Sequence, residues 1–367
     1  MFIMKIDPWK SIEIKDYNKA MKEFGIQSIN PLIKKLPKKH HYFTRNIVFG
    51  HKSLQPVLEA VKKKKPFVMM TGLMPSGKFH FGHKIIADLM IYFQEIGAEC
   101  YIAVADIESY LTRNVPLEKA RKVAIDEYLL NYIALGLNSE KTHFYFQSSG
   151  SKSYMNLSKF VAKKTTFNEL KAIYGDLTPE KIISALTQVA DILHPQLKEF
   201  GGPKPVVVPV GLDQLPHINL TRDIASRFKL NYNFILPSAT FNKMLPGLKG
   251  GKMSSSEPEN AVFLTDSPEN VEKKIKKYAF SGGQPTIKEH KEKGGNPDID
   301  VSYQWLTFLE EDDKKLKNIY EDYKSGKLLS SELKEILIKK INSFLKGHQE
   351  KMKKAVNSFD KFMYKDV

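Results

Sequence analysis

Three short apolar runs, separated by helix signals, most limit how this chain can fold. The runs are residues 67–71, 101–105 and 206–210, and their apolar character is continuous rather than alternating. Such runs predict strands buried on both faces. Between them lie prolines suited to a first helical turn and glycines suited to a helix end, namely Pro116, Pro179, Gly97 and Gly136. This alternation predicts a Rossmann-type parallel sheet covered by helices, with ligands beyond the carboxyl ends of the strands.

The pattern changes near residue 265. From Ser267 onward, apolar residues recur at helical spacing among lysines and glutamates, for example in residues 314–324 and 331–345. The first part of the chain instead carries dispersed prolines, which favour irregular structure. We therefore predict an α/β protein whose three parts are an N-terminal extension in residues 1–64, a Rossmann-type catalytic domain with a helical insertion in residues 65–265, and a C-terminal all-helical domain in residues 266–367.

Composition excludes several classes of site. Cys100 is the only cysteine among 367 residues, which rules out an intramolecular disulfide and a zinc site built from several cysteines. The ten histidines show no H-E-x-x-H spacing, and we expect no resident metal. No apolar run reaches about 18 residues, and Lys5 and Asp7 fall where a signal peptide would be apolar. We therefore expect a cytoplasmic protein with no membrane partner.

The net charge of +16 points to a polyanionic partner. Lysines gather in residues 34–39, 62–65 and 273–277, and through the last fifty residues. Each cluster alone is typical of a solvated surface. Their sum favours RNA over a membrane.

The stretch TGLMPSGKFHFGHK, residues 71–84, has two competing interpretations. Gly72, Gly77 and Lys78 fit the Gly-x4-Gly-Lys half of a phosphate-binding P-loop. Phe79 follows, however, where a P-loop needs a hydroxyl for magnesium, so this interpretation loses a metal ligand.

The second interpretation uses His80 and His83. We predict a helix from His83 to about Glu95, and its N-terminus would offer free N–H groups to a phosphate. Both imidazoles would donate hydrogen bonds to a phosphoryl group whose charge grows during reaction. Gly82 would leave room for a nucleotide base. Taken alone, H-x-G-H is more typical of surface histidines beside a turn.

A second candidate element lies nearly 170 residues downstream, in residues 250–256. Two glycines are followed by Lys252 and three serines. A mobile loop of this kind can close over a triphosphate and bring a cation to it during the reaction. Taken alone, the stretch is equally consistent with an exposed turn.

Together, H-x-G-H after an early strand and K-M-S-x-S after a later one resemble the signature of class I aminoacyl-tRNA synthetases. The histidine interpretation is therefore preferred. Residues 189–193, 211–214 and 221–225 resemble the tyrosyl and tryptophanyl members of that class. Further segments resemble tryptophanyl-tRNA synthetases of the archaeal and eukaryotic type: residues 7–9, 40–43, 279–283, 294–296, 298–301 and 307–313. The likeness covers nearly the whole chain.

The resemblance implies a reaction and a set of site residues. An amino-acid carboxylate, already ionised at pH 7, attacks ATP to form an adenylate, and the acyl group then passes to tRNA(Trp). The resemblance also implies that the helical domain in residues 266–367 binds the anticodon. Magnesium is expected to arrive with ATP, and a homodimer is expected. The implied catalytic residues are His80, His83, Lys252, Ser254 and Ser255. The implied ATP-binding residues are Gly72, Gly82, Gly211, Asp213 and Met253. The implied amino-acid-binding residues are Met70, Glu108, Gln188, Asp191 and Gln214.

The choice of amino acid depends on the hydrogen bonds of its side chain. The indole N–H of tryptophan only donates, whereas a tyrosine hydroxyl both donates and accepts. By the resemblance, Asp191 matches a position that reads the side-chain tip in bacterial tryptophanyl and in tyrosyl enzymes, so it does not discriminate between the two amino acids. Glu108 matches an indole acceptor of the eukaryotic type. L-Tryptophan is therefore favoured. Met70 and Ala103 depart from the polar pocket residues of that type. Each acid is also consistent with a structural ion pair, and Gln188 with a solvent-facing helix position.

Three alternatives stay open. A tyrosyl-tRNA synthetase would share the same signature. A small-molecule nucleotidyltransferase also uses H-x-G-H, but has no reason to carry a basic helical tail. A synthetase-derived RNA-binding protein that has lost activation would not need His80, His83, Lys252 and Gln214, all of which are present.

Overall fold

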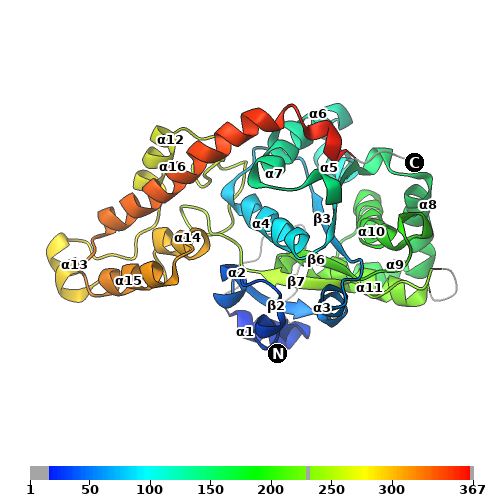
Figure 1. Ribbon diagram of the computed structural model, residues 1–367, viewed down its shortest axis with the longest axis horizontal. Coiled ribbons are helices and arrows are strands. Elements are labelled where there is room, and N and C mark those ends of the chain that lie inside the picture. The colour runs from blue at the N-terminus through cyan, green and yellow to red at the C-terminus, as the bar shows by residue number, and fades with distance from the viewer. Residues whose placement is uncertain (1–15, 229–231, 364–367) are drawn as a thin grey trace. The chain divides into compact units, whose positions relative to one another are not determined.

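A computed structural model describes residues 16–228 and 232–363 of the chain (Figure 1). Its centre is a seven-stranded sheet in the order β1-β2-β7-β6-β3-β4-β5. The three predicted strands are β3 (Val68–Leu73), β4 (Glu99–Val104) and β6 (Val206–Val210), and β3 pairs in parallel with both of the others. Two further parallel strands, β5 (Thr142–Phe146) and β7 (Ser238–Asn242), extend the sheet on either side. The predicted parallel sheet is confirmed.

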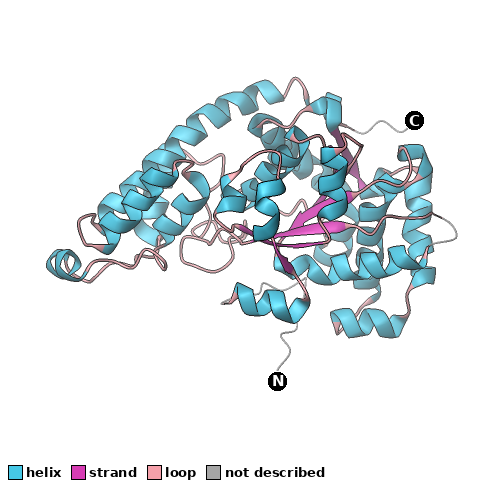
Figure 2. Cartoon of the chain, turned by 60° about the horizontal axis from the view of Figure 1, so that its bottom comes forward, coloured by secondary structure: helices cyan, strands magenta, loops and turns pink. Residues whose placement is uncertain are grey.

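Helices connect these strands and cover the sheet (Figure 2). The predicted helix after the histidines is α4 (Phe81–Glu95), which begins two residues earlier than expected. Pro179 opens α10 (Pro179–Leu193) as predicted, whereas Pro116 is the N-cap of α6 (Leu117–Val123) and lies just outside the first turn. The other helices beside the sheet are α5 (Asp106–Arg113), α7 (Leu130–Leu135), α8 (Lys152–Phe160), α9 (Phe167–Tyr174) and α11 (Leu215–Arg227).

The N-terminal part is more regular than its prolines indicated. Its elements are α1 (Tyr17–Phe24), β1 (Gln27–Ser28), α2 (His41–Thr44), β2 (Val48–Lys52) and α3 (Gln55–Lys62). β2 pairs antiparallel with β7, so this segment completes the sheet. Pro31 and Pro56 stand in the first turn of helices, where the missing N–H costs nothing. The quoted residues 7–9 lie outside the described residues.

The C-terminal helices follow the predicted change of pattern. They are α12 (Pro268–Tyr278), α13 (Ile287–Lys293), α14 (Val301–Leu309), α15 (Asp313–Lys324) and α16 (Ser330–Ala355). α16 packs against α12 and α14 through one apolar face, which buries Leu337 and Ile341. An α/β sheet with a helical C-terminal part is therefore the observed fold class.

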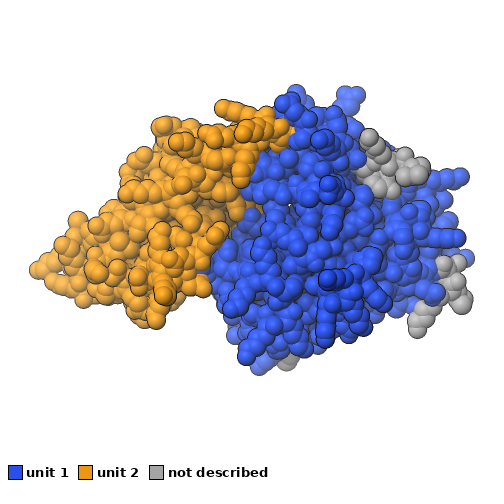
Figure 3. Space-filling view, in the orientation of Figure 1, with its two compact units in different colours: residues 1–76, 86–243, 356–367 blue, residues 77–85, 244–355 orange. Residues whose placement is uncertain are grey.

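The chain divides into two compact units (Figure 3). Unit 1 comprises residues 1–76, 86–243 and 356–367, and unit 2 comprises residues 77–85 and 244–355. The candidate histidines therefore belong to the same unit as the C-terminal helices. The functional boundaries predicted at residues 64 and 265 stay predictions. None of the helices in the described ranges has both the length and the apolar character needed to cross a bilayer.

Candidate active site

The histidine segment, Gly77–Ile85 of unit 2, is fixed by backbone pairing at its centre. The N–H of Phe81 donates to the carbonyl oxygen of Val262 at 3.2 Å, and the N–H of Leu264 donates to that of Phe79 at 3.1 Å. The side chains of Phe79 and Phe81 are buried. The backbone on both sides of His80 is therefore held in place, and only the histidine rings remain to be oriented.

Two backbone hydrogen bonds orient those rings. The N–H of Gly82 donates to Nδ1 of His80 at 3.1 Å, and the N–H of His80 donates to Nδ1 of His83 at 3.2 Å. The rings stack with centroids 3.7 Å apart and planes 20° apart. A ring nitrogen that accepts carries no proton, so the proton of each neutral ring lies on Nε2. Each neutral imidazole therefore carries its N–H group on Nε2.

The surroundings keep both imidazoles neutral. Burial lowers the pKa of His80 to about 4, with a smaller contribution from the charge of Lys252. Burial, His80 and Lys252 together lower the pKa of His83 well below its ordinary range. At pH 7 the pair therefore donates hydrogen bonds without carrying charge.

Gly82 has a local role that its sequence position did not reveal. A Cβ atom at this position would lie 2.9 Å from Cε1 and Nδ1 of His80. A glycine therefore lets the ring of His80 fold back and accept the N–H of Gly82. That Gly82 also leaves room for a nucleotide base stays a prediction.

The signature loop, residues 250–256, begins with two residues in the left-handed region. Gly250 has φ 89° and Gly251 has φ 68°, values that favour glycine. The next two side chains differ sharply in exposure, since Lys252 is exposed and Met253 is buried. Met253 approaches Gly82, with its Cβ 3.9 Å from where a Cβ of that glycine would lie. The buried methionine therefore anchors the loop beside the histidines and leaves the lysine in solvent.

The serines make a second contact with the histidine segment. Oγ of Ser255 donates to the carbonyl oxygen of Lys78 at 2.8 Å. Oγ of Ser254 lies 2.8 Å from Oγ of Ser256 within the loop. The two signature elements, nearly 170 residues apart in sequence, therefore meet within one unit. Taken alone, each element is also consistent with a surface turn.

Four other predicted residues gather in unit 1. Nε2 of Gln188, on α10, donates to Oε1 of Gln214 at 3.4 Å, and Nε2 of Gln214 donates to Oδ2 of Asp213 at 3.3 Å. Gly211 follows β6 directly, and a Cβ there would lie 2.4 Å from Oδ1 of Asp213. These residues form one polar row beyond the carboxyl end of β6, where a parallel sheet binds ligands. Gln188 is part of this row and not simply a solvent-facing helix residue.

Asp191 is buried and receives three hydrogen bonds. Its donors are the hydroxyl groups of Tyr145 at 2.9 Å and Tyr154 at 2.8 Å, and Nε2 of Gln147 at 2.7 Å. Burial raises the pKa of Asp191 to about 6, although these bonds act in the opposite direction. All three donors are neutral groups. Asp191 therefore accepts hydrogen bonds from neutral partners and, among the described residues, does not form the structural ion pair that the sequence left open.

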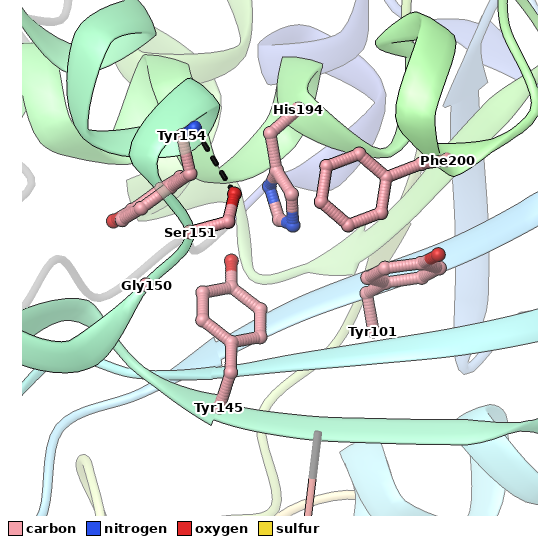
Figure 4. Close-up of a pocket in the computed structure, with 7 residues that line it drawn as sticks. All are labelled: Tyr101, Tyr145, Gly150, Ser151, Tyr154, His194 and Phe200. Carbon is pink, nitrogen blue, oxygen red and sulfur yellow. Dashed lines mark hydrogen bonds between the residues drawn. The ribbon is translucent and has the colours of Figure 1, made fainter. Parts of the chain in front are cut away.

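Sequence reasoning missed these three donors because nothing in the local pattern marks them. The two tyrosines also line a small aromatic cavity (Figure 4), together with Tyr101, Gly150, Ser151, His194 and Phe200. Nδ1 of His194 lies 2.9 Å from the carbonyl oxygen of Asp191, and burial lowers the pKa of this histidine to about 3. The two tyrosine donors of Asp191 therefore face a cavity that other aromatic side chains line.

The remaining predicted residues lie along the same sheet. Glu108 is half-buried on α5, just beyond β4, and its charge raises the pKa of Asp191. Met70 and Ala103 are fully buried in β3 and β4. Gly72 is exposed near the end of β3. Within residues 16–228 and 232–363, no three His, Cys, Asp or Glu side chains form a group that would hold a metal ion.

Known proteins resemble this chain along its length. The family described as tRNA synthetases class I (W and Y) matches residues 62–346. The tryptophan–tRNA ligase of Methanocaldococcus jannaschii is 44% identical over 361 residues, which cover 97% of each chain. The tryptophanyl-tRNA synthetase structure of Aeropyrum pernix has a TM-score of 0.91 at 42% identity and covers 98% of this chain and 99% of that one. A Plasmodium falciparum tryptophanyl-tRNA synthetase has a TM-score of 0.85 at 36% identity, with 95% and 97% covered. The chain belongs to the class I tRNA synthetases of the tryptophan and tyrosine family.

Proposed function

We propose that this chain is a tryptophan–tRNA ligase, which activates L-tryptophan with ATP, releases pyrophosphate and transfers the tryptophanyl group to tRNA(Trp). The observation that carries the proposal is the contact of the signature loop with the histidine segment, where Ser255 Oγ meets the carbonyl of Lys78. The similar proteins named above support the choice of tryptophan, since all three are named for it. They disfavour the tyrosyl alternative within the same family.

In the first step, the carboxylate oxygen of tryptophan forms a bond to the α-phosphorus of ATP. The bond from that phosphorus to the bridging oxygen breaks, and its electron pair leaves with pyrophosphate. No general base is required because the carboxylate is already ionised. Catalysis therefore rests on positioning and on stabilising phosphate charge.

The residues of unit 2 suit that task. We assign the Nε2–H groups of His80 and His83 to the phosphoryl oxygens, and the ammonium of Lys252 to the β and γ phosphates. Ser254 and Ser255 hold the loop in its contact with the histidine segment. Magnesium arrives as part of the ATP substrate. Gly72, Gly82 and Met253 are assigned to nucleotide binding.

The residues of unit 1 suit recognition of the amino acid and the ribose. Gln188 and Gln214 are assigned to the α-amino group, and Gly211 and Asp213 to the ribose of ATP. Met70 is assigned to the wall of the tryptophan pocket.

An acceptor for the indole N–H is supplied by Asp191 or Glu108. The variants Asp191→Asn and Glu108→Gln decide between them. Each variant is compared with wild type for its discrimination between tryptophan and the analogue methylated on the indole nitrogen. Only substitution of the true acceptor should reduce that discrimination.

The second step requires tRNA, and the basic helices of unit 2 are assigned to it. Lys273 and Lys277 on α12 are exposed, in keeping with a phosphate-binding surface. We expect the affinity for tRNA(Trp) to fall steeply with salt, because phosphate contacts release counterions. A cytoplasmic location follows from a role in translation.

The enzyme is also proposed to be a homodimer. Unit 1 exposes the large apolar side chains of Tyr110, Phe160, Phe167 and Ile183, with exposed fractions between 49% and 57%. Single exposed apolar side chains are ordinary on a protein surface, so the homodimer is proposed from the resemblance to the tyrosyl and tryptophanyl synthetases. Sedimentation equilibrium tests this assignment, and a monomer at micromolar concentration would contradict it.

Pyrophosphate exchange with a panel of amino acids tests the function as a whole. Purified protein and ATP should exchange labelled pyrophosphate with tryptophan and not with tyrosine. Exchange with tyrosine alone would establish the tyrosyl alternative. No exchange with any amino acid would favour an RNA-binding protein that has lost activation.

A further inference from the structure

Lys78 is the residue of the P-loop-like stretch to which the mechanism above assigns no role. It lies on the histidine segment, and its side chain is exposed. Its carbonyl oxygen is the acceptor for Oγ of Ser255. The lysine therefore stands at the point where the signature loop contacts the histidine segment.

Gly77 makes that contact close. A Cβ atom at this position would lie 2.6 Å from Cβ of Ser255, a distance that real Cβ atoms essentially never show. Any larger residue would therefore push the loop away from the segment. The short distance between Lys78 and the loop thus depends on the glycine beside it.

The side chain of Lys78 lies on the same face as His80. His80 pairs with Phe263 in an isolated antiparallel bridge. Directly opposite residues share a face, and the ammonium of Lys78 lies over the ring of Phe263, 5.8 Å from its centroid. The contact with Phe263 therefore places the ammonium of Lys78 on the same side of the segment as His80.

The ammonium is held only weakly there. Lys274 lies over the same ring at 4.5 Å, but its ammonium also binds Asp266 at 2.7 Å and the carbonyl oxygen of Ala261 at 3.0 Å. Lys78 has no carboxylate partner within residues 16–228 and 232–363. A long cation–π contact at an exposed site is a weak restraint. Lys274 is therefore anchored, while Lys78 can move to a stronger anionic ligand.

We propose that Lys78 is a second phosphate-binding cation, which leaves the ring of Phe263 and binds the β and γ phosphates of ATP beside Lys252. The signature loop carries a single lysine among residues 250–256. Pyrophosphate gains negative charge as its bond to the α-phosphorus breaks, and a second cation stabilises that charge. This inference rests on the proposed function and adds a residue to the phosphate site.

Two substitutions test the inference. Lys78→Met removes the charge and keeps an unbranched chain, and Lys78→Arg keeps the charge. We expect Lys78→Met to lower kcat/KM for ATP on the order of 10- to 100-fold and to raise KM for pyrophosphate in the reverse reaction. KM for tryptophan and the affinity for AMP should stay unchanged, because neither ligand has β or γ phosphates. Lys78→Arg should recover most of the activity.

Lys119 provides the matched control, since it is an exposed lysine on α6 to which no role is assigned. Lys119→Met removes the same charge and should behave as wild type. If Lys78→Met is no worse than Lys119→Met, the proposal is wrong. A loss that falls equally on tryptophan, or that arginine does not restore, would also overturn it. Failure of the wild-type protein to exchange pyrophosphate is a separate result, because it removes the proposed function itself.

Discussion

The residues of unit 2 that we assign to phosphate and the residues of unit 1 that we assign to the amino acid are oriented in different ways. In unit 2, His80 and His83 are oriented by backbone N–H groups within three residues of each ring. In unit 1, Asp191 is oriented by side chains that stand 37 to 46 residues away in the sequence. The first arrangement depends on the local backbone, and the second depends on the packing of β5, α8 and α10.

Because of this difference, the two regions should respond differently to substitution. A backbone-oriented ring keeps its hydrogen bonds as long as the segment keeps its path, so damage there requires removing the ring or distorting the backbone. A carboxylate held by distant side chains loses a hydrogen-bond donor when any one of those side chains is substituted. Substitutions in unit 2 should therefore change the rate of adenylate formation, and those around Asp191 should change tryptophan binding.

The largest expected effect is that of Lys252→Ala. We expect this change to slow adenylate formation about 100- to 1,000-fold in single-turnover assays, because it removes a cation from developing phosphate charge. Tryptophan affinity, measured by equilibrium binding, should change far less. Equal losses in both measurements would show that the loop also shapes the amino-acid site, and the contrast between the two regions would disappear.

The same contrast explains what the sequence revealed. The continuous apolar runs gave β3, β4 and β6 to within two residues, because burial on both faces leaves a strong local signal. The H-x-G-H and K-M-S-S-S motifs are equally local. The dispersed prolines led to a wrong prediction of irregular structure, because Pro31 and Pro56 stand in the first turns of helices and do not interrupt them.

The donors of Asp191 could not be found in this way. Tyr145 reads as one more apolar residue of a buried strand, and Tyr154 as one more aromatic residue of a helix. Only the register of β5 and the packing of α8 bring both hydroxyl groups to one carboxylate. The reason for Gly82 was also hidden, because the clash at this position exists only once the ring of His80 has folded back.

Gly82→Ala is the next largest expected effect and separates activity from stability. A Cβ at this position forces the ring of His80 to move, so we expect adenylate formation to fall on the order of 10- to 100-fold. Alanine is also the better helix former inside α4, by up to about 1 kcal/mol. Stopped-flow assays and thermal unfolding should therefore show lower activity without a matching loss of stability.

Gly347→Ala, on α16, is the matched control for that variant. A Cβ there meets nothing within 4 Å, and Gly347 has an ordinary φ. The control should keep full activity and gain slightly in stability. If Gly82→Ala behaved like this control, the account of the His80 ring would be wrong.

Tyr154→Phe should act on the other region with a smaller effect. It removes one hydrogen-bond donor from Asp191 and keeps the aromatic ring. We expect KM for tryptophan to rise about tenfold, because a buried carboxylate loses a partner. KM for ATP should stay within twofold of wild type, measured in the same exchange assay. A rise in KM for ATP alone would place Tyr154 with the phosphate residues.

The last expected effect, no larger than that of Tyr154→Phe, is a pH dependence in which Asp191 and His80 titrate in different ranges. Burial raises the pKa of Asp191 to about 6 and lowers that of His80 to about 4. If ionised Asp191 is the indole acceptor, KM for tryptophan should rise as pH falls through about 6. The rise should reach about tenfold at pH 5, since each unit below a pKa leaves tenfold less of the ionised form. KM for ATP should remain constant over this range. Initial rates at constant ionic strength measure both constants.

Stability must be followed in the same buffers, because the two groups shift it in opposite directions. Because the pKa of Asp191 is raised in the folded state, this group adds to the free energy of unfolding at low pH. That contribution is lost as pH rises from about 4 to about 6. A lowered pKa does the reverse for His80, whose contribution is present above its ordinary value of 6.5 and is lost as pH falls towards 4. The titratable groups that act on the Asp191 carboxylate are Tyr145 and Tyr154, whose own pKa values are raised by burial, and Glu108. Glu108→Gln should therefore move the midpoint of the tryptophan curve to lower pH, whereas a midpoint that survives in Asp191→Asn would assign the titration to another group.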